Sequence, residues 1–262
     1  MKAVILAGGF GTRLSEKTVD RPKPMVEVGG KPILWHIMKG LAAQGVDEFV
    51  VALGYKGNDI KQYFLNYYQL GCDLTVDLST GGLTTHGGTR ENWKVHLIET
   101  GLKTQTGGRI RRLQRIIGQE RFMMTYGDGV SDVDIAKLQR SHELSGKLAT
   151  VTAVRPPARF GRLEMDGHQI SSFSEKPQTG EGWINGGFMV LEPAVFSYIA
   201  GDRSSFELEA LEQIASEGQL NAYTHGGFWQ CMDTLRDLRL LERLWAEGKA
   251  PWAVWNRQLA QV

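Results

Sequence analysis

Short apolar runs alternate with amphipathic segments along the first half of this chain. The runs Lys2–Ala7, Phe49–Leu53 and Arg121–Tyr126 are each followed directly by a glycine, which is typical of buried strands that end in tight turns. Pro32 stands at a plausible first helical position, and apolar residues then recur at helical spacing up to Gly45. This pattern predicts strands that alternate with helices.

The alternation continues to about residue 148. The segment Gly57–Leu70 has helical spacing, and a short strand is predicted at Leu74–Leu78. Asp134 is placed to cap a helix that stops at Gly146. Because strands and helices follow one another in this way, the sequence predicts βαβ units and a mostly parallel sheet.

The second half is richer in predicted strands. Ser204 and Glu207 have capping-box spacing for a helix through Glu217, and a last helix begins near Thr234. The expected strands are Ala149–Val154, Arg162–Met165, Gln169–Ser174 and Trp183–Leu191. We expect one α/β domain over 1–262, with a mixed, mostly parallel sheet flanked by helices and a smaller β-rich part over 149–233. The tail Pro251–Trp255 is expected to pack either on its own domain or on a neighbouring molecule.

Composition and charge narrow the class of protein. The chain has 262 residues, 42% hydrophobic and 23% charged, and a net charge of +1, so no strong basic field recruits nucleic acid or an anionic membrane. Cys72 and Cys231 follow no metal or redox spacing and fit a reduced cytoplasmic protein. The apolar N-terminal run is too short for a signal sequence or a membrane span.

A glycine cluster follows the first predicted strand. Gly8, Gly9 and Gly11 allow backbone N–H groups to converge on a phosphate, and Arg13 adds a planar cation. No Gly-Lys-Ser/Thr follows, and Leu14 replaces the third glycine of a dinucleotide fingerprint. Taken alone, the cluster is equally compatible with a tight turn and with a phosphate site.

A lysine on a stiff segment changes that balance. Pro22 and Pro24 restrict the backbone on both sides of Lys23, so the segment is predicted to be extended and rigid. Lys23 follows Arg13 by about ten residues, and the two cations together suit the charge that develops on a pyrophosphate leaving group.

These segments resemble a known family. GGFGTRLSEKT followed by RPKPMVEVGGKPIL is similar to the signature of the sugar nucleotidylyltransferases. The likeness continues through KPILWHIMK, TYGDGV, RFG, SEKP, INGGF, FWQCMDTLRD and GKAPW, and so covers nearly the whole chain. Many members carry proline where this chain has Glu16, and the acidic residue favours the cytidylyl branch over the uridylyl and thymidylyl branches.

The resemblance implies a fold, substrates and a cofactor. The fold is the Rossmann-like nucleotidyltransferase fold, with a nucleotide-binding half at 1–148, a sugar-phosphate half at 149–233 and a C-terminal helix and tail at 234–262. The substrates are CTP and α-D-glucose 1-phosphate, the products CDP-glucose and pyrophosphate, and the cofactor Mg²⁺. A cytoplasmic homo-oligomer is also implied.

The resemblance further assigns residues to the site. Arg13 and Lys23 are the implied catalytic cations. The implied nucleotide-binding residues are these two with Leu6, Ala7, Gly8, Gly9, Gly11, Thr12, Thr104, Gly108, Arg109, Gly127 and Asp128. The glycines before Arg109 open a predicted helix, whose N-terminus suits an anion or a carbonyl group.

Two aspartates are the implied Mg²⁺ ligands. Asp128 lies between glycines at the end of a predicted strand, and Asp233 precedes the last helix. Without the resemblance, a turn for Asp128 and a helix cap for Asp233 would be the simpler interpretations. Asp132 is expected at the loop surface and Asp134 at a helix cap, although Asp132-Val133-Asp134 matches the Asp-x-Asp pattern of glycosyltransferases.

The implied sugar-phosphate site combines polar side chains from the second half with one aromatic residue. Its members are Tyr126, Glu175, Lys176, Asn185 and Gly186. Tyr126 and Trp229 have core packing as the simpler interpretation. The six histidines show no ligand spacing, and none is assigned to chemistry. A thymidylyl-, uridylyl- or guanylyltransferase and a non-catalytic nucleotide-sugar regulator are the alternative functions.

Overall fold

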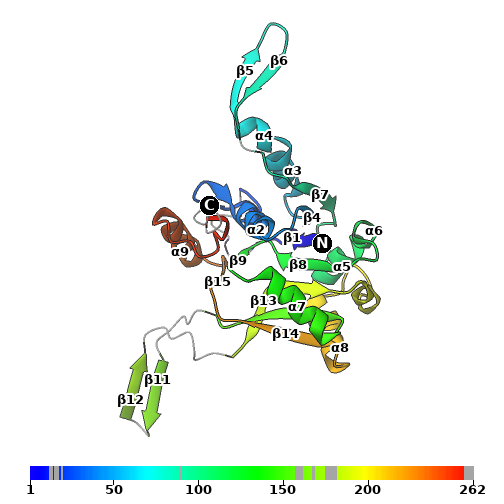
Figure 1. The fold of residues 1–262 in the computed structure, drawn as a ribbon, viewed down its shortest axis with the longest axis vertical. Helices are drawn as coiled ribbons and strands as arrows, with labels where there is room; N and C mark the ends of the chain where they lie inside the picture. The colour runs from blue at the N-terminus through cyan, green and yellow to red at the C-terminus, as the bar shows by residue number, and fades with distance from the viewer. Residues whose placement is uncertain are drawn as a thin grey trace.

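A seven-stranded mixed sheet forms the centre of the computed structural model (Figure 1). The structure describes residues 1–11, 14, 18, 20–88, 90–156, 162–166, 169–174 and 182–256. The strand order is β14-β10-β13-β8-β1-β4-β7. Only β13 runs antiparallel to its neighbours, β10 and β8, while the other pairs in the sheet are parallel. The predicted mixed, mostly parallel sheet is therefore confirmed.

The central sheet has seven strands, of which those at 94–99 and 220–225 were not predicted and the other five lie close to their predicted positions. The seven strands are β1 (Ala3–Leu6), β4 (Glu48–Leu53), β7 (Lys94–Glu99), β8 (Phe122–Tyr126), β10 (Ala149–Val154), β13 (Ile184–Leu191) and β14 (Leu220–His225). The shorter pairs outside it are β2 (Glu27–Val28) with β3 (Lys31–Pro32), β5 (Asp73–Asp77) with β6 (Gly82–His86), β9 (Gly129–Ser131) with β15 (Trp229–Cys231), and β11 (Arg162–Asp166) with β12 (Gln169–Ser174).

Helices cover both faces of the sheet. One face packs on α2 (Ile33–Ala42), α7 (Ile135–Ser145) and α9 (Leu235–Ala246), and the other on α5 (Thr106–Arg112), α6 (Gln114–Ile117), η3 (Pro193–Tyr198), η4 (Phe206–Leu211) and α8 (Glu212–Ser216). The remaining helices are η2 (Lys23–Met25), α3 (Gly57–Leu65) and α4 (Tyr67–Leu70). No helix among the described residues is long and apolar enough to cross a membrane.

The cap predicted at Asp134 and the helix start predicted near Thr234 are confirmed, and one predicted cap differs. Asp134 accepts from the backbone N–H of Lys137 at the start of α7, and Thr234 with Asp237 forms a capping box at α9. The capping box predicted for Ser204 and Glu207 is wrong. Ser205 caps η4, a π-helix, by accepting from the backbone N–H of Leu208, and the side chain of Glu207 instead accepts from the hydroxyls of Tyr126 and Thr106.

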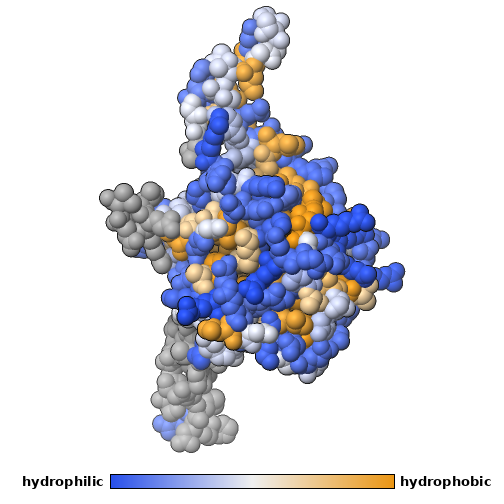
Figure 2. Space-filling model, turned by 45° about the vertical axis from the view of Figure 1, so that its right-hand side comes forward, coloured by the Kyte–Doolittle hydropathy of each residue, from blue (hydrophilic) through white to orange (hydrophobic). Residues whose placement is uncertain are grey.

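The strands of the second half join the same central sheet as those of the first. β10, β13 and β14 extend it on the side of β8, and the β11–β12 hairpin is the part that projects (Figure 1). A second hairpin, β5–β6, projects at the opposite end, so the strand predicted at Leu74–Leu78 exists but does not enter the core. Nearly all residues of β5 and β6 are exposed, and Figure 2 shows their hairpin projecting from the rest of the molecule.

The tail packs on its own domain. Trp252 is 1% exposed, stacks on Phe228 and donates its indole N–H to Nδ1 of His36. The Nε2 atom of His36 lies 2.8 Å from the carbonyl oxygen of Val28, so Nε2 carries the proton. The tail thereby covers the apolar face of α2.

Candidate active site

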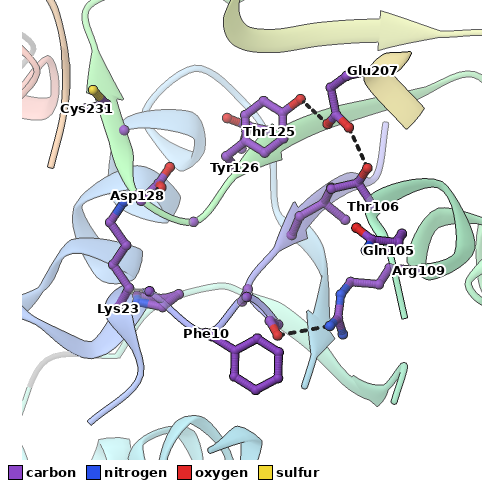
Figure 3. Close-up of a pocket in the computed structure, with 18 of the residues that line it drawn as sticks. Phe10, Lys23, Gln105, Thr106, Arg109, Thr125, Tyr126, Asp128, Glu207 and Cys231 are labelled. Carbon is purple, nitrogen blue, oxygen red and sulfur yellow. Dashed lines mark hydrogen bonds and ion pairs between the residues drawn. The ribbon is translucent and has the colours of Figure 1, made fainter. Parts of the chain in front are cut away.

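A cleft of about 640 Å³ opens at the C-terminal ends of β1 and β8. The glycine loop Gly8–Gly11, the β7–α5 connection, the end of β8 and residues before α9 line it (Figure 3). Ligands in open α/β sheets collect beyond the carboxyl ends of the strands, and this cleft lies at that edge.

Arg109 holds the glycine loop in place through hydrogen bonds to backbone carbonyls. Its Nη2 atom donates to the carbonyl of Gly8 at 2.9 Å, and Nη1 donates to the carbonyls of Leu53 and Gly101 at 3.0 and 2.8 Å and to the hydroxyl of Thr100 at 2.7 Å. Arg109 is 5% exposed, and burial lowers its pKa. Gly8 must lack a side chain, because a Cβ there would overlap the guanidinium.

These contacts change the interpretation of two implied nucleotide residues. Arg109 lines the cleft, but its two terminal nitrogens bond the protein's own backbone. The N–H groups of Gly107 and Gly108 both bond the carbonyl of Ser204, so the N-terminus of α5 is occupied by the chain itself. The hypothesis that this helix end holds a ligand anion or carbonyl does not fit that bonding, whereas Thr104 does line the cleft.

Lys23 forms ion pairs with both implied Mg²⁺ ligands, Asp128 and Asp233. Its ammonium lies 2.7 Å from Oδ2 of Asp128 and 2.5 Å from Oδ1 of Asp233, with side-chain exposures of 10%, 33% and 13% for the three residues. Burial opposes the charge of Lys23, but the two carboxylates outweigh it, so its pKa is raised from the ordinary value. Three residues far apart in the sequence therefore meet at one point.

The local fold explains this meeting. The β9–β15 pair aligns Gly129 with Cys231, and the backbone N–H of Met232 donates to the carbonyl of Asp128 at 2.8 Å. These contacts place Asp233 beside Asp128. Because Thr234 and Asp237 cap α9, Asp233 is not needed as the helix cap.

The Lys23 segment differs in shape from its prediction. Pro22 is extended, with φ −68° and ψ 149°, but Lys23–Met25 forms a single 3₁₀ turn rather than an extended arm. The prolines still stiffen the segment, and the turn directs Lys23 into the cleft.

The described residues contain no group of three or more histidine, cysteine, aspartate or glutamate side chains that would hold a metal. Asp128 and Asp233 nevertheless converge on one cation, the ammonium of Lys23. Mg²⁺ is commonly held by one or two carboxylates together with substrate phosphates and water, so this pair of oxygens fits it.

The other end of the cleft is polar. Tyr126, Asn185, Gly186 and Trp229 line it, so Tyr126 and Trp229 are both pocket residues rather than purely core residues. Glu207 also lines this end, between Tyr126 and Thr106 (Figure 3). Sequence reasoning missed it, because its spacing from Ser204 indicated a helix cap.

Two further predictions concern the neighbouring aspartates. Asp134 is a cap, as expected. Asp132 is not a loop-surface residue: its Oδ1 atom accepts from the N–H of Phe228 at 2.7 Å and lies 3.1 Å from Nε2 of His225. Its side chain is 16% exposed and holds the turn before β15. Thr12, Arg13, Glu175 and Lys176 lie outside the described residues.

Comparisons with known proteins agree with this geometry. The family model described as nucleotidyl transferase matches residues 2–243. The glucose-1-phosphate cytidylyltransferase of Salmonella typhi is 50% identical over 257 residues, which cover 98% of this chain and 100% of the relative. The probable glucose-1-phosphate cytidylyltransferase of Bacillus subtilis (strain 168) is 46% identical over 97% of this chain and 100% of its own length.

A solved structure supports the fold. HddC from Yersinia pseudotuberculosis superposes with a TM-score of 0.70 and 28% sequence identity, covering 93% of this chain and 99% of that chain.

Proposed function

Because this chain belongs to the nucleotidyl transferase family, we propose that it transfers CMP from CTP to α-D-glucose 1-phosphate and releases pyrophosphate. The observation that carries the choice of substrates is the 50% identity to a glucose-1-phosphate cytidylyltransferase over the full length of that relative. The meeting of Lys23, Asp128 and Asp233 in one cleft supports the reaction type.

The proposed chemistry is an in-line displacement. An oxygen of the sugar phosphate attacks the α-phosphorus of CTP, a P–O bond forms, and the bond to pyrophosphate breaks. The nucleophile is already an anion, so positioning and charge neutralisation carry the catalysis rather than a general base. Lys23 is a buried cation of the cleft and would stabilise charge that moves onto pyrophosphate.

We also propose that the reaction depends on Mg²⁺. Asp128 and Asp233 would hold the ion, since their oxygens already converge on one cation. When bound, the ion would neutralise charge on the phosphates.

A panel of nucleoside triphosphates against glucose 1-phosphate, read as pyrophosphate release, tests the substrate choice. We expect CTP to be used most efficiently, by kcat/KM. Preference for GTP, UTP or dTTP would contradict the proposed base, and absence of turnover with every nucleotide would favour a regulatory binding protein. Mannose 1-phosphate with GTP is included because a probable mannose-1-phosphate guanylyltransferase of rice is 32% identical over 96% of this chain and 67% of its own length.

We further propose that the chain forms a cytoplasmic homo-oligomer. The projecting β5–β6 hairpin pairs Val76 with Leu83, and these side chains are 54% and 47% exposed. An isolated two-stranded hairpin is marginally stable in water, which supports a role in contacts between copies. Light scattering on the parent and on a Val76→Lys, Leu83→Lys double variant should show a larger mass for the parent; equal monomeric masses would contradict the proposal.

A further inference from the structure

The carboxylate of Glu207 is held in the cleft entirely by hydroxyl groups, as far as the described residues show. Its Oε1 atom accepts from the hydroxyl of Tyr126 at 2.6 Å. Its Oε2 atom accepts from Thr106 at 2.5 Å and from Ser205 at 3.0 Å. These donors come from β8, from α5 and from the cap of η4, so the carboxylate is fixed from three directions.

The bonding leaves one acceptor position open. A carboxylate oxygen has two lone-pair positions, so Oε2 is saturated and Oε1 keeps one. Each hydroxyl has only one hydrogen, and that hydrogen is already donated to Glu207. Because Glu207 lines the cleft, its remaining position is available to a ligand group that donates a hydrogen bond.

Tyr126 links Glu207 to Asn185 across the cleft. Its ring lies against Gly187, where φ is +84° and a Cβ would come within 2.6 Å of Cδ2. The side chain of Asn185 hydrogen-bonds Tyr126, and its Oδ1 atom accepts from the N–H of Gly187 at 2.8 Å. Since Oδ1 is used in this way, the amide nitrogen of Asn185 faces the tyrosine hydroxyl.

Charge decides which part of a substrate lies against Glu207. Phosphates suit the end of the cleft that holds the glycine loop, Lys23 and the Mg²⁺ proposed for Asp128 and Asp233, whereas the carboxylate of Glu207, which bonds no lysine or arginine among the described residues, repels them. In Figure 3, Lys23 and Glu207 lie at opposite sides of the pocket. The group against Glu207 must therefore be uncharged and rich in hydrogen-bond donors.

We propose that Glu207 binds a hydroxyl group of the hexose of the sugar 1-phosphate, and that Tyr126 positions this carboxylate. This inference rests on the proposed function. The glycine loop after β1 takes the triphosphate, so the second substrate approaches from the side of β8 and β13, where Tyr126 and Asn185 lie. A hydroxyl donates into the open position of Oε1, whereas a carbonyl or a phosphate oxygen does not.

The Glu207→Gln variant tests the proposal through steady-state kinetics with CTP and glucose 1-phosphate. A hydrogen bond to a charged group corresponds to about 10- to 100-fold in binding, so KM for glucose 1-phosphate should rise by about that factor. KM for CTP should stay within about twofold of the parent. Glu209→Gln is the matched control, because Glu209 is exposed on the same π-helix and should leave both constants unchanged.

A panel of monodeoxy glucose 1-phosphates separates direct contact from a structural effect. The parent should discriminate against the analogue that lacks the hydroxyl bound by Glu207. The Glu207→Gln variant should discriminate against that same analogue about tenfold less, because the partner of the hydroxyl is already altered. The proposal would be overturned if Glu207→Gln discriminated against that analogue as strongly as the parent does, or if KM rose for CTP alone.

Tyr126→Phe keeps the test available if Glu207→Gln does not fold. It removes one donor from the carboxylate and leaves the charge, so KM for glucose 1-phosphate should again rise more than KM for CTP. If the parent itself rejects glucose 1-phosphate, the proposed function fails, and the same comparison is made with the sugar 1-phosphate that the parent does use. The inference fails if the parent is active and both variants keep its KM for the sugar 1-phosphate.

Discussion

The buried, neutral imidazole of His36 should make the folded chain sensitive to mild acid. His36 is 1% exposed, beneath Trp245 and Trp252, and burial lowers its pKa from 6.5 to about 4. Protonation would place a charge among apolar rings and would remove the acceptor for the indole N–H of Trp252. The unfolded chain has no such penalty and binds the proton more tightly.

The sign and size of the effect follow from this difference. Because the folded pKa lies below the unfolded one, the contribution of His36 to stability is complete above pH 6.5 and is lost as the pH falls toward 4. A difference of about 2.5 pKa units corresponds to about 3 kcal/mol when the loss is complete, and to about 2 kcal/mol at pH 5.

Urea unfolding at pH 7.5 and pH 5.0 measures the effect, and the fluorescence of the surrounding tryptophans reports the transition. The control is His36→Gln, whose amide keeps a donor for the carbonyl of Val28 and an acceptor for Trp252 but does not titrate. The parent should lose about 2 kcal/mol more than the variant between the two pH values. Losses equal within about 0.5 kcal/mol would refute the assignment of a depressed pKa to His36.

Three substitutions in the cleft give further tests. Lys23→Met should lower turnover by about 10²- to 10³-fold, and turnover at the rate of the parent would exclude Lys23 from catalysis. The same variant should bind Mg²⁺ more tightly in calorimetry without nucleotide, because the ammonium no longer competes for the two carboxylates. Asp128→Asn should raise the Mg²⁺ concentration needed for half-maximal rate, and an unchanged requirement would remove Asp128 from the proposed ligands. Arg109→Lys should raise KM for CTP about tenfold, with a smaller change in KM for glucose 1-phosphate, because one ammonium cannot bond the carbonyls of Gly8, Leu53 and Gly101 together. If KM for CTP stays at the value of the parent, the glycine loop does not depend on Arg109.

Much of the fold was predictable because periodicity reports local burial directly. The apolar runs became β1, β4 and β8, and the caps at Asp134 and Thr234 lie where hydroxyl and carboxylate side chains indicated helix starts. The hairpin β5–β6 shows the limit of this signal. Its strand has the alternation of a half-buried strand, but nothing in the described part of the chain covers its apolar face.

The position of a residue in the cleft was predictable where it follows a strand end, as for Asp128, or where prolines stiffen its segment, as for Lys23. It was not predictable where function depends on contacts between distant segments. Arg109 has the sequence position of a ligand-binding residue, yet its bonds to the carbonyls of Gly8 and Gly101 arise only in the folded chain. Glu207 was assigned to a cap by its spacing, and only the shift of the cap to Ser205 reveals its place in the cleft.

Residues at the end of β8 contact groups at both ends of the cleft. Tyr126 fixes the open acceptor of Glu207, and Asp128, two residues later, shares the cation Lys23 with Asp233. A hexose 1-phosphate carries its anion at C1 and has further hydroxyl groups across the ring from it. Placing the hydroxyls against Glu207 and the phosphate toward Lys23 and the proposed Mg²⁺ satisfies both ends, whereas the reverse orientation sets the phosphate against a carboxylate that bonds no lysine or arginine among the described residues. Because one short segment positions both groups, a change in the β8–β9 turn should disturb sugar binding and phosphate alignment together, and kcat and KM for the sugar phosphate should change in concert.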